Sequence, residues 1–190
     1  MDYKNFSCAG LFIFDHECKK VLLGKDKNGF LSPQKGGYEV LKDDALFKCA
    51  IRETFEESGI SVHELQFSEK EYIEYSASGK PNILYWVAKL KHPKNEFKFD
   101  PSELESVDWH TFDNVAGLKP QRLAILKAMV GDLPSIVWVD DVSQKRFLRC
   151  NPENTKNKPK NKYNKESRAL VKLLRHDLDS QKFRMMKLVM

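Results

Sequence analysis

Three glutamates in this chain have a type and spacing that point to metal chemistry. Glu53, Glu56 and Glu57 lie three and four positions apart, in a stretch from residue 45 to 58 with helical periodicity. At this spacing the side chains project from one face of a helix, where like charges repel by roughly a few tenths of a kcal/mol per pair. A hard divalent cation would neutralise them and share its coordination with substrate phosphates. The alternative is a solvated acidic helix face.

The surrounding stretch resembles the Nudix box, Gly-x5-Glu-x7-Arg-Glu-x-hydrophobic-Glu-Glu-x-Gly-hydrophobic. The matching positions are Arg52, Glu53, Glu56, Glu57, Gly59 and Ile60. There are two departures, because Asp44 replaces the first glutamate and one extra loop residue places Tyr38 at the glycine position. A surface loop absorbs one residue at small cost, so the departure affects loop geometry more than metal binding.

The resemblance implies a hydrolase that depends on Mg²⁺ or Mn²⁺ and assigns a role to each residue of the box. Glu56 and Glu57 would be metal ligands, and Glu53 a third ligand or a carboxylate that orients water. Arg52 would hold a glutamate through a bidentate contact, and Asp44 would assist from outside.

The same resemblance places the phosphate contact in the loop before the helix. Lys35, beside the backbone N–H groups of Gly36 and Gly37, would bind phosphate. Hydrolysis of a phosphoanhydride depends largely on charge neutralisation and on positioning water, so a lysine suits this place. Taken alone, Lys35 would be an ordinary solvated lysine.

Over roughly residues 7–130 the chain is similar to asymmetric diadenosine tetraphosphate hydrolases. The likeness is carried by CAGLFIF at 8–14, LSPQKG at 31–36, RET with the Glu-Glu pair at 52–57, and Tyr75, Lys80-Pro81 and YWVAKL at 85–90. This implies asymmetric cleavage of bis(5′-nucleosyl) tetraphosphate, a small-molecule nucleotide substrate.

That likeness adds three site residues. Tyr75 would stack on an adenine ring, a contact worth about 1–3 kcal/mol, and Lys80 would bind the distal phosphates. Glu103, six residues before Trp109, would be an extra metal ligand or a base, so it joins Glu57, Glu53 and Arg52 as an expected catalytic residue. The alternatives are a half-buried strand tyrosine and a member of an acid-rich loop.

Substrate preference is less well supported than the pyrophosphatase reaction. Leu31 replaces a tryptophan, Gly37 replaces a histidine, and residues 100–102 replace a histidine-rich stretch. Two alternatives therefore stay open: a pyrophosphohydrolase acting on the cap or triphosphate of an RNA 5′ end, and a non-catalytic Nudix-fold RNA-binding module. The intact glutamate set argues against the second.

Charge divides the chain into an acidic body and a basic tail. Residues 1–143 hold 18 Lys or Arg and 23 Asp or Glu, a net charge of −5, whereas residues 144–190 hold 14 and 4, a net charge of +10. We expect a Nudix domain over 1–143, a disordered basic linker over 144–165 and an amphipathic helix over 166–190. The tail would contact RNA or serve only for solubility.

Within the tail, residues 167–177 resemble the opening helix of RNA 2′-phosphotransferases through Arg175-His176. Only fourteen residues follow His176, which is too few for that catalytic domain. We therefore expect an accidental likeness, and the alternative is a fragment of a fusion.

Composition and patterning complete the expectations. The 190 residues, 41% hydrophobic, suit one globular domain with an appendage. No membrane span, signal peptide or cysteine-based metal site is found, so an intracellular monomer in the cytoplasm or nucleus is expected. Expected strands are 7–14, 20–23, 30–33, 65–75, 82–90 and 106–109, and expected helices run from 43 or 44 to 58 and from 120 to 129. This order predicts an α/β fold of the Nudix type, an α/β/α sandwich around a mixed sheet.

Overall fold

The structure is a computed structural model, and it describes residues 5–140 of the chain. No helix in this part is long and apolar enough to cross a membrane. The strands are β1 (Cys8–Phe14), β2 (Lys20–Asp26), β3 (Leu31–Ser32), β4 (Gln34–Gly37), β5 (Leu65–Tyr75), β6 (Pro81–Leu90) and β7 (Leu104–Thr111). The helices are α1 (Leu46–Ser58) and α2 (Pro120–Asp132), with short 3₁₀ turns η2 (Val62–Glu64) and η3 (Leu133–Ser135).

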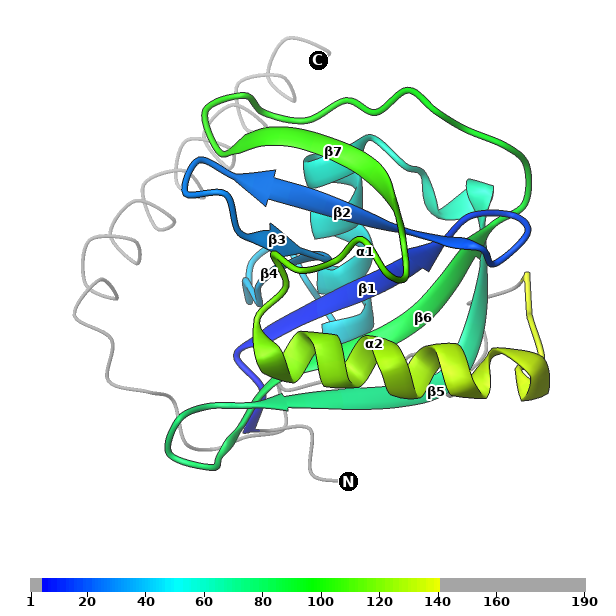
Figure 1. The fold of residues 1–190 in the computed structure, drawn as a ribbon. Coiled ribbons are helices and arrows are strands. Elements are labelled where there is room, and N and C mark those ends of the chain that lie inside the picture. The colour runs from blue at the N-terminus through cyan, green and yellow to red at the C-terminus, as the bar shows by residue number, and fades with distance from the viewer. Residues whose placement is uncertain (1–4, 141–190) are drawn as a thin grey trace, which may run out of the picture. The chain divides into compact units, whose positions relative to one another are not determined.

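The strands form one mixed sheet in the order β3-β2-β1-β6-β5, with β4 paired to β1 and β7 paired to β2 (Figure 1). The pairing of β1 with β6 is parallel, and the other pairings are antiparallel. A parallel pair needs a crossover, and the chain makes it through α1. The predicted mixed α/β fold is confirmed.

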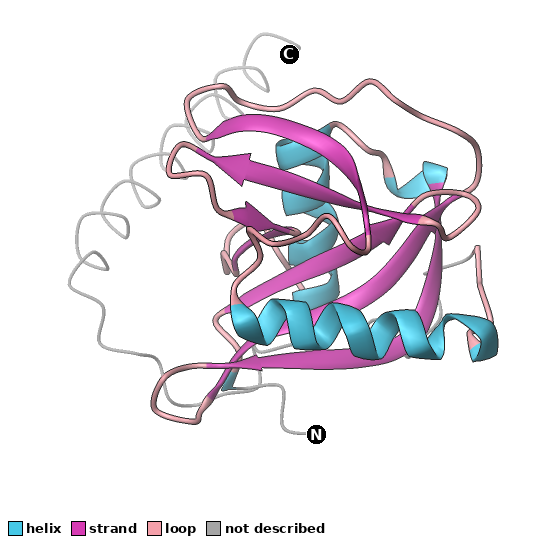
Figure 2. Ribbon diagram, viewed as in Figure 1, coloured by secondary structure: helices cyan, strands magenta, loops and turns pink. Residues whose placement is uncertain are grey.

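Alternation along β1 divides the core into two layers. Leu11 and Ile13 belong to the cluster that includes Phe47 of α1, whereas Phe12 and Phe14 belong to the cluster of α2. Successive side chains of a strand point to opposite faces, so one apolar strand serves both helices. Figure 2 shows α2 in front of the sheet and α1 behind it.

The ends of α1 agree only in part with the sequence prediction. Gly59 ends the helix with a left-handed φ of 68°, as predicted, and its N–H donates to the carbonyl of Phe55. The predicted acidic N-cap is wrong, since the N-cap is Ala45 and it makes no side-chain cap bond. The carboxylate of Asp43 is bound elsewhere, to Arg52.

Residues after α2 return to the sheet. The backbone of Val139 exchanges two hydrogen bonds with Phe67 of β5, at N···O distances of 2.8 and 2.9 Å. Trp138 packs against the α2 cluster, and the Lys89 ammonium lies 5.1 Å from its ring centroid. The folded body therefore extends at least to residue 139, while the predicted linker and helical tail lie outside the described residues.

Candidate functional site

Arg52 links several residues of the predicted Nudix box through its guanidinium group. Its Nε and Nη2 donate to the two oxygens of Asp43 at 2.9 and 2.8 Å. Its Nη1 donates to Glu53 at 2.7 Å and to Glu56 at 2.9 Å, and Nη2 also reaches the carbonyl of Gly37 at 2.9 Å. One guanidinium thus ties two of the predicted metal ligands to the phosphate loop.

The acid that supports Arg52 is Asp43, whereas Asp44 was expected to assist the box from outside. Asp43 is 2% exposed, and the N–H of Glu39 donates to it at 2.9 Å. Burial alone would raise the pKa of Asp43, but the bonds from Arg52 and Glu39 outweigh it and leave that pKa lowered. Asp44 is exposed and pairs with Lys48 at 2.6 Å. The longer loop shifts the supporting acid by one residue, which a fixed spacing does not reveal.

Glu57 lies deeper than the other two glutamates. Its Oε2 accepts a hydrogen bond from the backbone N–H of Lys35 at 2.8 Å. The pKa of Glu57 is raised to about 7, mainly by burial and in smaller part by the charges of Glu53 and Glu103, while the backbone N–H and the charge of Lys35 act to lower it. These three acids and the loop lysine are therefore close enough to interact.

Gly36 lies directly against the side chain of Glu53 of α1. A Cβ atom at this position would overlap the Glu53 carboxylate, so a larger residue would displace that carboxylate. Burial raises the pKa of Glu53, with Arg52 acting in the opposite direction. The close approach brings the phosphate loop against the acidic face.

The donor set suits a hard divalent cation by its chemistry. Glu53, Glu56 and Glu57 offer six carboxylate oxygens within about one helical turn. A bound cation would favour the ionised form of Glu57, whose pKa burial raises. Within residues 5–140, no three Asp, Glu, His or Cys side chains already converge as a metal cluster. Arg52 holds Glu53 and Glu56, while Lys35 holds Glu57.

The predicted nucleoside-binding residues lie on the β5–β6 hairpin. Tyr75 is the last residue of β5 and is 46% exposed, so part of its surface is accessible to a ligand. Lys80 is exposed in the turn that follows. Tyr85 and Trp86 are buried in the two core clusters, as predicted from their place in mid-strand.

A second arginine centre was not predicted from the sequence. Arg122 of α2 and Glu74 of β5 form a buried ion pair, with Nε 2.8 Å from Oε2. A single arginine in α2 and a single glutamate in β5 carry no motif, and their meeting depends on the tertiary fold.

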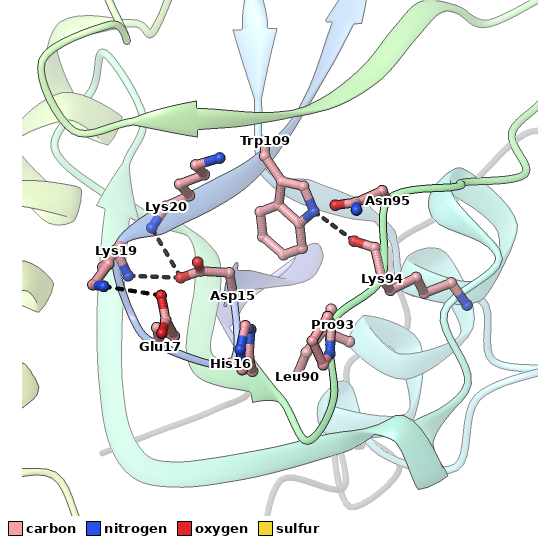
Figure 3. Close-up of a pocket in the computed structure, with 10 residues that line it drawn as sticks. All are labelled: Asp15, His16, Glu17, Lys19, Lys20, Leu90, Pro93, Lys94, Asn95 and Trp109. Atoms are coloured by element: carbon pink, nitrogen blue, oxygen red, sulfur yellow. Dashed lines mark hydrogen bonds and ion pairs between the residues drawn. The ribbon is translucent and has the colours of Figure 1, made fainter.

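A cavity of about 250 Å³ lies at the other end of β1 (Figure 3). It is lined by Asp15, His16, Glu17, Lys19, Lys20, Leu90, Pro93, Lys94, Asn95 and Trp109. The indole of Trp109 forms one wall and donates to the carbonyl of Lys94 at 2.7 Å. None of the predicted site residues lines this cavity, so the acidic face and Tyr75 belong to a different part of the surface.

Comparisons with known proteins agree with this geometry. Residues 4–129 match the NUDIX domain. Over 118 residues the chain is 29% identical to mRNA-decapping enzyme subunit 2 of Arabidopsis thaliana, a match that covers 60% of this chain and 31% of that protein. The chain thus spans about a third of the length of the curated relative it matches.

Two solved structures share the fold. A C. elegans Ap4A hydrolase binary complex has a TM-score of 0.58 and 23% identity, covering 67% of this chain and 98% of that one. The NUDIX domain of Shewanella oneidensis NrtR, complexed with ADP ribose, has a TM-score of 0.52 and 15% identity, covering 66% and 86%. At these identities the likeness establishes the fold alone. The domain match covers more than half of the chain, so the chain belongs to the Nudix family.

Proposed function

We propose that the chain hydrolyses bis(5′-nucleosyl) tetraphosphate asymmetrically, giving a nucleoside triphosphate and a nucleoside monophosphate. The observation that carries this proposal is the contact between Glu57 and the backbone of Lys35. It brings the acidic face of α1 against the strand that bears the phosphate-binding lysine, which is the juxtaposition that phosphoanhydride hydrolysis requires.

Each residue of the acidic face has a separate task in this reaction. Glu53, Glu56 and Glu57 would hold Mg²⁺ or Mn²⁺, which neutralises phosphate charge and lowers the pKa of bound water. Arg52 keeps Glu53 and Glu56 in fixed orientations through its Nη1. The Lys35 ammonium binds a phosphate oxygen and offsets the charge that moves onto the leaving phosphate.

Glu103 is the proton acceptor in this proposal. It is exposed, and its charge contributes to the raised pKa of Glu57, so it lies within electrostatic reach of the acidic face. Its side chain forms no ion pair within residues 5–140, in contrast to Glu53 and Glu56 on Arg52. As the water oxygen bonds to phosphorus and the anhydride P–O bond breaks, one water proton passes to this carboxylate.

The substrate class follows from the hairpin. The exposed ring of Tyr75 offers a stacking surface for a base, and Lys80 offers a charge for phosphates distant from the cleaved bond. A ligand that reaches both residues and Lys35 must combine a nucleoside with a long phosphate chain.

Product analysis tests the proposal. The full chain is incubated with Mg²⁺ and, separately, with diadenosine tetraphosphate, capped RNA and inositol pyrophosphates. We expect ATP and AMP from the dinucleotide. Equal amounts of ADP, or turnover of capped RNA without turnover of the dinucleotide, would contradict the proposed substrate.

Two observations favour a second candidate, a pyrophosphohydrolase that acts on RNA 5′ ends. The chain is 29% identical to a decapping enzyme subunit, and residues 144–190 carry a net charge of +10. Contacts with RNA phosphates weaken steeply as salt rises, so turnover of capped RNA through the tail should fall sharply between about 50 and 200 mM salt. A KM for capped RNA that does not change with salt would contradict a role of the tail.

A further inference from the structure

A buried network joins α2 to the end of β5. Arg122 donates from Nε and Nη2 to the two oxygens of Glu74 at 2.8 and 3.3 Å. The hydroxyl of Tyr85 donates to the same carboxylate at 2.8 Å, and Arg122 Nη1 donates to Ser32 Oγ at 3.2 Å. Burial would raise the pKa of Glu74, but the bonds from Arg122 and Tyr85 outweigh it and keep this carboxyl ionised.

Stability alone does not account for this pair. Arg122 and Glu74 have side chains that are 7% and 12% exposed, and removing two charges from water costs several kcal/mol per ion before their attraction offsets it. Arg122 also lies in the first turn of α2, where the helix dipole disfavours a cation. Apolar residues of similar size would fill the space between α2 and β5 without either cost. We therefore look for a role of the pair in holding these elements in position.

One side of the network holds the nucleoside-binding hairpin. Glu74 directly precedes Tyr75, and the register of β5 with β6 shifts between these two residues. The N–H of Tyr75 donates to Oε1 of Gln121 at 3.0 Å, so adjacent residues of α2 hold adjacent residues of β5. Figure 1 shows α2 beginning beside this hairpin.

The other side reaches the phosphate-binding strand. Ser32 is separated from Lys35 by only two residues, and its hydroxyl also donates to the Pro33 carbonyl at 2.9 Å. At Gly10, which pairs with Lys35, an added Cβ would lie 2.6 Å from the Lys35 Cβ and 3.0 Å from the Tyr85 ring. Lys35 and Tyr85 therefore both lie beside Gly10, and Tyr85 binds Glu74 from there.

We infer that Arg122 and Glu74 are positioning residues that fix the separation between Tyr75 and Lys35, and so select substrates by the distance from base to phosphate. This inference rests on the proposed function, in which Tyr75 binds the base and Lys35 a phosphate. Neither Arg122 nor Glu74 touches substrate. They act through the strand ends that they hold together.

The test is a double-mutant cycle between Arg122→Lys and Tyr75→Ala, measured with diadenosine tetraphosphate. Lysine keeps the charge but loses the bidentate fork. We expect Arg122→Lys to raise KM about fivefold, with kcat within about twofold of wild type. A fivefold rise corresponds to about 1 kcal/mol, the low end of the free energy of a base–aromatic stack. In the Tyr75→Ala background the same change should leave KM unaltered, because the contact it positions is already absent. Lys127→Ala, an exposed change on α2, is the matched control.

The remaining outcomes distinguish failure of the inference from failure of the proposed function. An unchanged KM in Arg122→Lys, or an equal rise in both backgrounds, overturns the inference, since a merely structural pair would lower the melting temperature and kcat independently of Tyr75. If Arg122→Lys does not fold, Glu74→Gln enters the same cycle. If the wild-type protein does not cleave the dinucleotide, the proposed function fails, and the cycle is then measured as affinity for AMP, with the same expected loss and non-additivity.

Discussion

Two arginine networks lie on opposite faces of the sheet, and they differ in how far apart in the sequence their members are. Arg52 of α1 is 16% exposed and binds acids at positions 39, 43, 53 and 56, all within thirteen residues of it. Arg122 of α2 is 7% exposed and binds partners 48 and 90 residues away. The first network is formed by residues close in sequence and reaches solvent at Glu39 and Glu56, whereas the second depends on the tertiary fold and is buried.

This difference corresponds to a division of labour. Under the proposed function, the first network orients the carboxylates that would act on the phosphoanhydride, so changes there should lower kcat. The second holds the hairpin and strand that would bind the base and phosphate, so changes there should raise KM. The predictions below test this division, from the largest expected effect to the smallest.

The largest effect is expected from Glu57→Gln. The change removes one negative charge from the acidic face without altering volume, and the loss of one electrostatic stabiliser costs on the order of 10²–10³ in kcat. Steady-state kinetics with Mg²⁺ and circular dichroism measure rate and fold. Glu105→Gln, an exposed acid paired with Lys25, is the control. A Glu57→Gln protein with more than half of wild-type kcat would remove Glu57 from the set of metal ligands.

Next in size is the contrast between Asp43→Asn and Asp44→Asn. Breaking the buried pair of Asp43 with Arg52 should lower the free energy of unfolding by about 3 kcal/mol, whereas the exposed Asp44–Lys48 pair should matter by less than about 0.5 kcal/mol. Urea denaturation of both variants measures this. Equal stabilities would mean that the pair of Asp43 with Arg52 contributes no more to folding than an exposed pair.

The same pair predicts a pH dependence. Because the pKa of Asp43 is lower in the folded protein, its stabilisation is fully present above the unfolded pKa of about 3.9 and is lost as pH falls through the folded pKa. The stability gap between wild type and Asp43→Asn should therefore be full at pH 7 and shrink in acid. A gap that widens in acid would contradict the assignment.

The contrast between the networks also explains which features the sequence could predict. The acidic face of α1 and its end at Gly59 follow from spacing within one helix, and the long strands β5 and β6 follow from their apolar runs. β4 was missed because Pro33 interrupts the pattern and its Gly-Gly pair has no strand preference. A Cβ at Gly36 would overlap the Glu53 side chain of α1, a contact that only the packed structure shows.

Asp43 and Arg122 escaped prediction for related reasons. Asp43 and Asp44 are the same residue type, and only the turn from Glu39 to Asp43 decides which one faces Arg52. Arg122 and Glu74 meet through the packing of α2 on β5, and neither has a local signature. Local spacing reports chemistry held within one element, while contacts between elements require the fold.

The third prediction concerns Tyr75→Ala. Stacking on a base remote from the cleaved bond is present in ground and transition states alike, so KM for adenine dinucleotides should rise about fivefold or more with kcat little changed. Tyr75→Phe keeps the ring and should behave as wild type. An unchanged KM, or a large fall in melting temperature, would show that the exposed ring has a structural role.

The smallest effect on catalysis is expected from truncation, and the position of the cut matters. Ending the chain after Asp140 keeps both networks, the hairpin and Glu103, so kcat and KM for small nucleotides should stay within about twofold of wild type. Ending it after Leu133 removes the two hydrogen bonds between Val139 and Phe67, and removes Trp138 from the α2 cluster. That shorter protein should melt lower.

The longer truncated protein also isolates the tail. It lacks residues 144–190, with their net charge of +10, and keeps an acidic body. If the tail contacts RNA, gel-shift titrations at low and moderate salt should detect salt-sensitive binding by the full chain and much weaker binding by the protein ending at Asp140. Equal affinities would place the RNA contact on the body. Slower hydrolysis of diadenosine tetraphosphate by a truncated protein with an unchanged melting temperature would mean that the two networks do not suffice for the small-nucleotide reaction, and that residues beyond 140 contribute to it.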